Sequence, residues 1–308
     1  MNTTLMEHAT DTIAVGSKSF ATAAKLFDPT TRRSVLMLYA WCRYCDDVID
    51  GQALGFNATP VDSTQAEQRL EMLRNQTLRA WEGGEMSEPA FAAFQEVALG
   101  HNIPLQLAYD HLDGFAMDVR ETHYETFDDT LQYCYRVAGV VGLMMARVMG
   151  VRDEAMLDRA CDLGLAFQLT NIARDIVEDA RVGRCYLPAQ WLAEADIPLE
   201  AIAQPKMRSP LADIARRLVA EAEPYYASAQ QGLAGLPLRS AWAIASAHGV
   251  YREIGVKVSA AGARAWDTRQ GTNRFEKSGL LLKGAGLALT SRFATLAPRP
   301  TGLWQRPR

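Results

Sequence analysis

The sequence has few cysteines, no long apolar run and no excess of basic residues, and each deficit excludes a class of protein. Its 308 residues include five cysteines, an odd number without disulfide-framework spacing, which is typical of a chain kept reduced in the cytoplasm. The most apolar run, VAGVVGLMMA, is shorter than the roughly 20 residues of a membrane-spanning helix. The net charge of -4 argues against nucleic acid as a partner, because such proteins normally carry a basic surface.

The sequence also lacks the signals of a secretory leader, of a β-sheet and of a Rossmann-type nicotinamide site. The N-terminal segment MNTTLMEHATDTIAVGSKSF has no basic region followed by an apolar one. Alternating β-branched runs between turn dipeptides are missing, as is a GxGxxG motif. Cys42 and Cys45 have CxxC spacing, but no second pair follows at zinc-site distance, and the histidines show no ligand spacing. A zinc site is therefore not expected.

A helical pattern runs along nearly the whole chain. Apolar residues recur at three- and four-residue spacing, which predicts an all-α fold with one domain, 1–308, built as a helical bundle around a central space. The polar stretches 51–63 and 187–210 are interpreted as loops between helices, and a flexible tail is expected from about residue 294. The predicted helices are 3–15, 20–26, 30–50, 64–82, 88–99, 104–121, 127–149, 153–180, 188–194, 210–232, 237–262 and 279–292.

The segment RYCDDVID places three carboxylates directly after the apolar run VLMLYAW. At about 100° per residue, Asp46 and Asp50 share a helix face with Tyr39 and Arg43, and Asp47 lies at the edge of this face. Clustered acids beside apolar side chains repel one another and are costly to desolvate unless a positive charge is near. The cluster therefore predicts a cation.

A second stripe, in AFQLTNIARDIVEDA, is flanked by Arg174 and Glu178. It places two amides and two acids on one helix face: Gln168, Asn171, Asp175 and Asp179. Two such helices facing each other can hold hard cations, and Mg²⁺ is commonly shared between carboxylates and substrate phosphates. Ion pairing along each helix is the alternative for one stripe alone, but two matching stripes favour a site for metal and phosphate.

Two further segments carry groups suited to a phosphate ester with an apolar chain. VGSKSF offers the hydroxyls of Ser17 and Ser19 and the ammonium of Lys18 near a predicted helix start, although ordinary helix capping explains them equally well. YCYRVAGVVG places Tyr133 on a helix with small residues, which permit either close helix packing or room for a ligand chain.

The C-terminal region mixes apolar and basic residues. LLLKGAGLALTSRF and the tail PRPTGLWQRPR combine Leu, Phe and Trp with Lys and Arg, as segments at a membrane interface do. A last core helix with a frayed tail fits the same residues, so the sequence leaves both interpretations open.

Four motifs in this order resemble those of the squalene/phytoene synthase family of head-to-head prenyl transferases: SKSF, YAWCRYCDDVID, YCYRVAGVVG and QLTNIARDIVEDARVGRCYLP. The resemblance covers essentially the full chain and implies an all-α isoprenoid-synthase bundle with a central active-site cavity. It implies condensation of two geranylgeranyl diphosphates to phytoene through a cyclopropyl intermediate, prephytoene diphosphate, with release of two diphosphates, in carotenoid biosynthesis. It also implies Mg²⁺ or Mn²⁺ as cofactor, without NADPH.

The resemblance further implies roles for individual residues. The metal ligands would be Asp46, Asp50, Asn171, Asp175 and Asp179. The residues acting with them in catalysis would be Tyr39, Arg43, Asn171 and Arg174. The substrate-binding residues would be Ser17, Lys18, Ser19, Phe20, Tyr133, Val137, Gln168, Tyr186 and Tyr251.

Two alternatives stay open. The first is a C30 synthase acting on farnesyl diphosphate, either a squalene synthase with NADPH or a dehydrosqualene synthase, and the depth of the pocket would decide it. The second is a non-catalytic helical interaction protein, which would have no reason to combine acidic stripes with Arg43, Asn171, Arg174 and SKSF. The expected location is the cytoplasm, with peripheral contact on the inner face of the cell membrane beside other carotenoid-pathway enzymes.

Overall fold

The computed structural model describes residues 3–16, 18–51 and 63–308. Across these ranges the regular structure is helical and contains no strand, which confirms the all-α prediction. The main helices are α1 (Thr3–Gly16), α2 (Lys18–Ala24), α3 (Pro29–Asp50), α4 (Ser63–Trp81), α5 (Pro89–His101), α6 (Leu105–Val119), α7 (Phe127–Cys134), α8 (Val140–Val148), α9 (Glu154–Arg181), α10 (Ala189–Glu194), α11 (Arg208–Gln231), α12 (Leu238–Ala261) and α13 (Arg274–Thr290).

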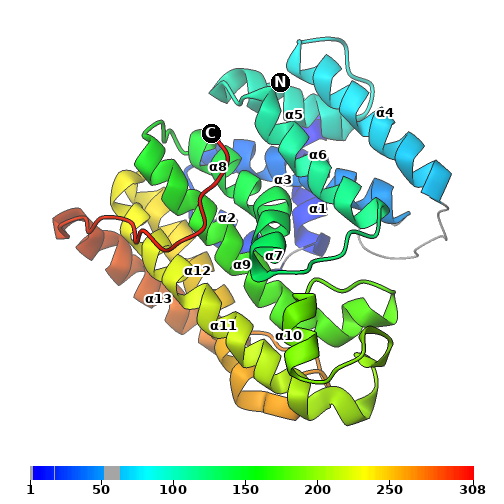
Figure 1. Cartoon of the computed structure of the whole chain (residues 1–308). Coiled ribbons are helices and arrows are strands. Elements are labelled where there is room, and N and C mark those ends of the chain that lie inside the picture. The colour runs from blue at the N-terminus through cyan, green and yellow to red at the C-terminus, as the bar shows by residue number, and fades with distance from the viewer. Residues whose placement is uncertain (1–2, 17, 52–62) are drawn as a thin grey trace.

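Helix α9 runs through the middle of the molecule (Figure 1). The N-terminal helices α3, α4 and α5 lie on one side of it and the yellow to red C-terminal helices on the other, where α2 packs on α12 (Figure 1). It packs on α8, α11 and α12. Because its long axis crosses the whole bundle, residues at its two ends contribute to distant parts of the same interior.

Two expected helices differ in detail. The predicted helix 127–149 is interrupted by a π-helical turn, Tyr135–Gly139, between α7 and α8. The last helix begins at Arg274 instead of residue 279, because Asn273 caps it. The Asn273 Oδ1 accepts from the Glu276 amide at 2.9 Å, and the Glu276 carboxylate accepts from the Asn273 amide at 2.7 Å. This capping box is a sequence signal that apolar periodicity does not register.

The π-helical turn and α8 press closely onto α9. A Cβ added at Gly142 would lie 2.4 Å from the Ala160 carbonyl oxygen, and one added at Gly164 would lie 2.4 Å from the Ala138 carbonyl oxygen. Both glycines therefore permit close backbone packing. Gly142 and Gly164 also border the central cavity, so these small residues both allow the helices to pack closely and leave room in the cavity.

The tail after α13 packs against the bundle. Arg299 pairs with the fully buried Asp162 of α9 at 2.7 Å, Leu303 is buried in the core, and the Trp304 ring lies 5.4 Å from that of Tyr135. This packing differs from the expected flexible tail, because the partners of its arginines lie far back in the sequence. Within the described ranges no helix is both long and apolar enough to cross a membrane.

Candidate active site

A cavity of about 990 Å³ opens between α3 and α9. Its charged walls come from the C-terminal turns of these helices and include Asp50 and Asp179. Its apolar walls come from the end of α8, the start of α9 and the turn after α11, and include Met149, Met156 and Leu233. Met156 and Asp179 lie 23 positions apart on α9, or about 35 Å by the α-helical rise. The cavity is thus long and polarised.

The stripe on α3 faces this cavity as predicted. Tyr39, Arg43, Asp46 and Asp50 line it, whereas Asp47 does not. Arg43 lies between the two neighbouring acids, with its Nη1 3.0 Å from Asp46 and its Nη2 donating to Asp47 at 2.7 Å. Asp47 is buried and takes up part of the arginine's charge, so Asp46 and Asp50 are the carboxylates of this helix that a ligand can reach.

The stripe on α9 lies across the cavity. Gln168, Asn171, Asp175 and Asp179 all line it. Arg174 donates two hydrogen bonds to Asp175, from Nε at 2.8 Å and from Nη2 at 2.6 Å. The Asn171 amide donates weakly to Gln168 at 3.4 Å, and the buried Oδ1 of Asn171 has no hydrogen-bond partner. An unsatisfied buried oxygen that faces a cavity is suited to a ligand or ion.

The surroundings of one acid in each stripe destabilise its ionised form. Burial raises the pKa of Asp46 to about 7, partly opposed by Arg43. Burial and the neighbouring Asp175 raise the pKa of Asp179 to about 7. With pKa values this high, the ionised carboxylates are destabilised near neutral pH, and a bound cation would stabilise them.

Two further charged residues of the cavity wall were not predicted from sequence. Arg184 pairs with Asp50, and Asp118 of α6 accepts hydrogen bonds from Tyr133 at 3.2 Å and from Tyr186 at 3.0 Å. Burial raises the pKa of Asp118 to about 6. Arg184 lies in the motif QLTNIARDIVEDARVGRCYLP but not on its acidic stripe, and Asp118 lies in none of the four motifs. Helical spacing therefore could not identify either residue.

A third unpredicted residue, Arg269, comes from the segment before α13. Its Nη2 donates to Asp175 at 2.9 Å, and its other amino group pairs with Glu178. The cavity wall near the acids therefore carries four guanidinium groups: Arg43, Arg174, Arg184 and Arg269. Guanidinium groups bind phosphate oxygens in a bidentate manner, so the acids and arginines together suit a metal–diphosphate ligand.

The donor set fits a hard divalent cation. In the part of the chain that the structure describes, no three His, Cys, Asp or Glu side chains already converge at metal-binding distance. Two pairs of cavity-facing carboxylates and the unpartnered Oδ1 of Asn171 nevertheless supply oxygen ligands of the kind that Mg²⁺ and Mn²⁺ take. The arginines that now contact some of these carboxylates are the groups that an incoming diphosphate would engage.

The predicted substrate-binding residues gather around the same space. Phe20 stacks on Tyr39 at 5.7 Å, Tyr133 on Tyr186 at 4.5 Å, and Tyr251 on Phe167 at 4.1 Å. Those with described side chains all line the cavity: Phe20, Tyr133, Val137, Gln168, Tyr186 and Tyr251. Ser17 and the side chains of Lys18 and Ser19 lie outside the described residues, so their predicted contact with phosphate stays a prediction.

Comparison with known proteins agrees with this geometry. The family model for squalene/phytoene synthase matches residues 13–276. The chain is 66% identical over 306 residues to a 15-cis-phytoene synthase of Pantoea ananas, covering 99% of each, and 51% identical over 299 residues to one of a Paracoccus species, covering 97% of each.

Solved structures show the same architecture. A dehydrosqualene synthase bound to a ligand superposes with a TM-score of 0.82 at 27% identity, over 93% of this chain and 97% of that one. A squalene synthase from Alicyclobacillus acidocaldarius, at 19% identity, shares the fold with a TM-score of 0.66 over 95% of this chain and 96% of that one. Fold, site and sequence agree, and the chain belongs to the squalene/phytoene synthase family.

Proposed function

We propose that the protein is a 15-cis-phytoene synthase, a prenyltransferase of carotenoid biosynthesis. It condenses two geranylgeranyl diphosphates to phytoene through prephytoene diphosphate and releases two diphosphates. The observation that carries the proposal is one cavity in which paired acidic stripes and four arginines meet a long apolar wall. The near full-length identity to bacterial phytoene synthases supports the C20 substrate and the C40 product.

The charged end of the cavity binds and activates the diphosphate. Asp46, Asp50, Asn171, Asp175 and Asp179 would hold Mg²⁺ or Mn²⁺, which would supply positive charge to stabilise the departing diphosphate. The guanidinium groups of Arg43, Arg174, Arg184 and Arg269 bind its remaining oxygens and hold it in place. Asp50 and Asp175 in turn fix the orientation of Arg184 and Arg174 by ion pairs.

The apolar walls protect the allylic cation that remains. Val137, Met145 and Met149 line the cavity and exclude water, which would otherwise quench the cation. The rings of Phe20 and Tyr39 stack on each other and border the same space, and aromatic rings attract positive charge. Tyr133 and Tyr186 are locked by Asp118, so their rings present a fixed wall to both substrate chains.

The outer face of α13 supports peripheral contact with a membrane. Phe275 and Leu282 are 91% and 75% exposed, and Leu289 and Phe293 continue the stripe along the helix and just beyond it. Exposed Arg274, Lys283 and Arg292 give this region a positive charge that complements anionic lipid. Contact with the inner face of the cell membrane would place the enzyme where apolar substrates and products, and the other pathway enzymes, are found.

Vesicle binding tests this part of the proposal. Leu282→Asp should lower the fraction that sediments with vesicles containing anionic lipid about tenfold or more, since the apolar stripe is interrupted by a charge. Leu199→Asp, at an exposed leucine far from α13 in the sequence, is the matched control and should bind as the unaltered protein does. Equal binding of both variants would contradict membrane contact through α13.

A C30 synthase is the second candidate, because the dehydrosqualene synthase structure superposes over nearly the whole chain. The deciding experiment incubates the protein with Mg²⁺ and either geranylgeranyl or farnesyl diphosphate, with and without NADPH, and identifies the hydrocarbon by mass. A C40 product from the C20 substrate, independent of NADPH, is expected. A C30 product formed in preference to it would move the assignment to a C30 synthase, and no hydrocarbon from either substrate would refute both.

A further inference from the structure

A buried arginine, Arg159, lines the cavity at its apolar end, in the neighbourhood of Met156 and Leu233. The residue is 4% exposed, and its Nε has no hydrogen-bond partner. Burial lowers the pKa of its guanidinium. A charge in this position is costly and does not contribute to the acid and arginine cluster at the opposite end. Its presence in the wall of an apolar pocket therefore calls for a physical role.

Backbone carbonyls from two separate segments hold this guanidinium. Its Nη1 donates to the Ser228 carbonyl of α11 at 3.1 Å, and its Nη2 donates to the Ala297 carbonyl of the C-terminal tail. Gly232 leaves the room that the side chain needs, because a Cβ there would lie 3.1 Å from the Cβ of Arg159. The position of the charge thus depends on the tail.

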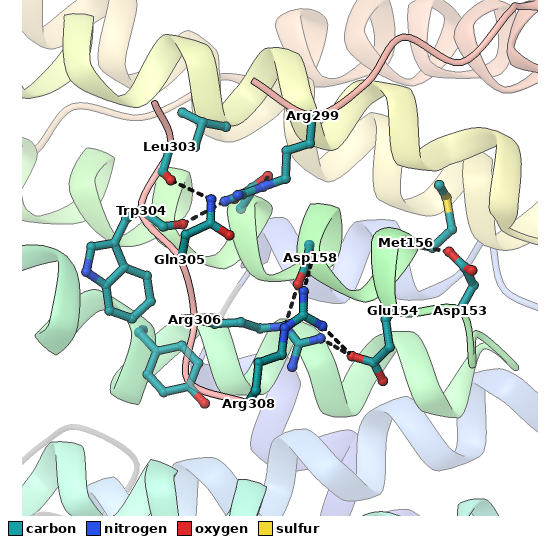
Figure 2. Close-up of polar contacts among 12 residues, drawn as sticks. Asp153, Glu154, Met156, Asp158, Arg299, Leu303, Trp304, Gln305, Arg306 and Arg308 are labelled. Carbon is teal, nitrogen blue, oxygen red and sulfur yellow. Dashed lines mark hydrogen bonds and ion pairs between the residues drawn. The ribbon is translucent and has the colours of Figure 1, made fainter. Parts of the chain in front are cut away.

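The tail is itself anchored on α9, through Asp158 (Figure 2) and through Asp162, and neither acid lines the cavity. Arg299 donates to Asp162 through Nε at 2.8 Å and Nη2 at 2.7 Å, and it also donates to the Trp304 carbonyl at 2.7 Å. Asp162 is fully buried and accepts a further bond from Ser228 at 2.6 Å. Removing Arg299 would leave a buried carboxylate without its counterion, so this anchor resists opening.

The end of the tail is fastened by a second group of ion pairs (Figure 2). Arg306 donates to Asp158 at 2.7 Å, and Arg308 donates to Asp158 and Glu154, each at 2.9 Å. The Trp304 amide donates to the Tyr225 hydroxyl at 3.1 Å. None of residues 294–308 lines the cavity, so the tail influences it indirectly, through residues such as Arg159 that the tail holds in place.

We propose that Arg159, positioned by the tail 294–308, limits the length of the isoprenoid chain that the cavity accepts. The inference rests on the proposed function. A chain longer than C20 that reached this end would have to push the guanidinium off its two carbonyl acceptors. Charged donors would then be buried without partners, which costs far more than the added apolar contact returns. The anchored tail prevents the acceptor at Ala297 from following the displaced side chain.

The test compares the C20 substrate with geranylfarnesyl diphosphate, its C25 homologue, as the ratio of their kcat/KM values. Arg159→Met keeps the length of the side chain and removes its charge, and it should raise the C25 to C20 ratio about tenfold. The paired variant Asp162→Asn/Arg299→Gln loosens the tail without leaving a buried charge, and it should raise the ratio by less. Arg216→Ala, at an exposed arginine of α11, is the matched control and should leave the ratio unchanged.

A folded Arg159→Met enzyme with the unaltered ratio would overturn the proposal. An equal loss on both substrates with a lower Tm would also overturn it, because that is the signature of a merely structural arginine. If Arg159→Met does not fold, Arg159→Lys and the paired variant decide by the same ratio. If the unaltered enzyme makes no C40 product, the proposed function fails, and calorimetric binding of the C20 and C25 diphosphates to each variant still tests the length limit.

Discussion

The acidic residues at the two ends of α9 differ in how their charge is neutralised. Near its start, Asp162 is fully buried and satisfied by Arg299 and Ser228, in contacts that no ligand needs to reach. Near its end, Asp179 faces the cavity, and burial together with Asp175 raises its pKa to about 7. A buried carboxylate that is paired within the protein contributes to the stability of the fold. A carboxylate whose ionised form is destabilised in a cavity indicates where a ligand binds and neutralises it.

The largest expected effect comes from removing a strained acid. Asp46→Asn should lower kcat by about 10³-fold, since it removes an oxygen that stabilises the leaving group through a cation. The fold should persist, because Asp46 lies in the cavity wall and Arg43 keeps its ion pair with Asp47. Turnover and circular dichroism measure the two properties.

The adjacent carboxylate provides a control for this variant. Asp47→Asn removes the same charge from the next residue, which does not line the cavity. We expect it to change kcat much less than Asp46→Asn does. Equal losses in the two variants would mean that the net charge of α3, and not the position of its carboxylates, determines activity.

The satisfied acid should show the opposite pattern. Asp162→Asn leaves Arg299 without its counterion, with a side chain that is only 14% exposed, so it should destabilise the protein by about 3 kcal/mol. Urea unfolding followed by fluorescence measures the change. Turnover of the C20 substrate by the molecules that remain folded should stay within about threefold of the unaltered value, since Asp162 touches no substrate.

The pH dependence of metal-free stability separates the two kinds of acid further. The folded pKa values of Asp46 and Asp179, about 7, lie above the usual value of 3.8, so the folded state binds the extra protons. Stability should therefore fall as the pH rises from about 4 to about 7. Thermal unfolding in EDTA at pH 5 and pH 8 measures this, and Asp46→Asn should weaken the dependence.

Metal addition should reverse the same trend. Mg²⁺ stabilises ionised carboxylates, so it should raise Tm more at pH 8 than at pH 5. A Tm increase of equal size at both pH values would show that the metal binds without drawing on the raised pKa values of these acids.

The smallest effect is expected at the tyrosine pair. Tyr186→Phe removes one hydrogen bond to Asp118 and keeps the stacked ring, so kcat should fall by about tenfold or less and the product should remain the same. Product analysis by mass spectrometry checks both statements. A change in product chain length would assign Tyr186 to the length limit that we place at Arg159.

Helical periodicity was sufficient to predict most of the fold and the inner stripes of the site. Asp46 and Asp175 could be found from sequence because each lies one turn from another acid on the same helix. Arg269 and Arg299 could not, since their partners Asp175 and Asp162 lie 94 and 137 positions earlier in the chain. Spacing along one helix carries no information about which distant arginine will meet an acid.

A crystal structure with Mn²⁺ and a non-hydrolysable geranylgeranyl thiodiphosphate tests the central claim most directly. We predict anomalous Mn²⁺ peaks between the α3 acids Asp46 and Asp50 and the α9 acids Asp175 and Asp179, with the chain running toward Met156. Metal bound elsewhere, or a chain that leaves the cavity toward α13, would contradict the account.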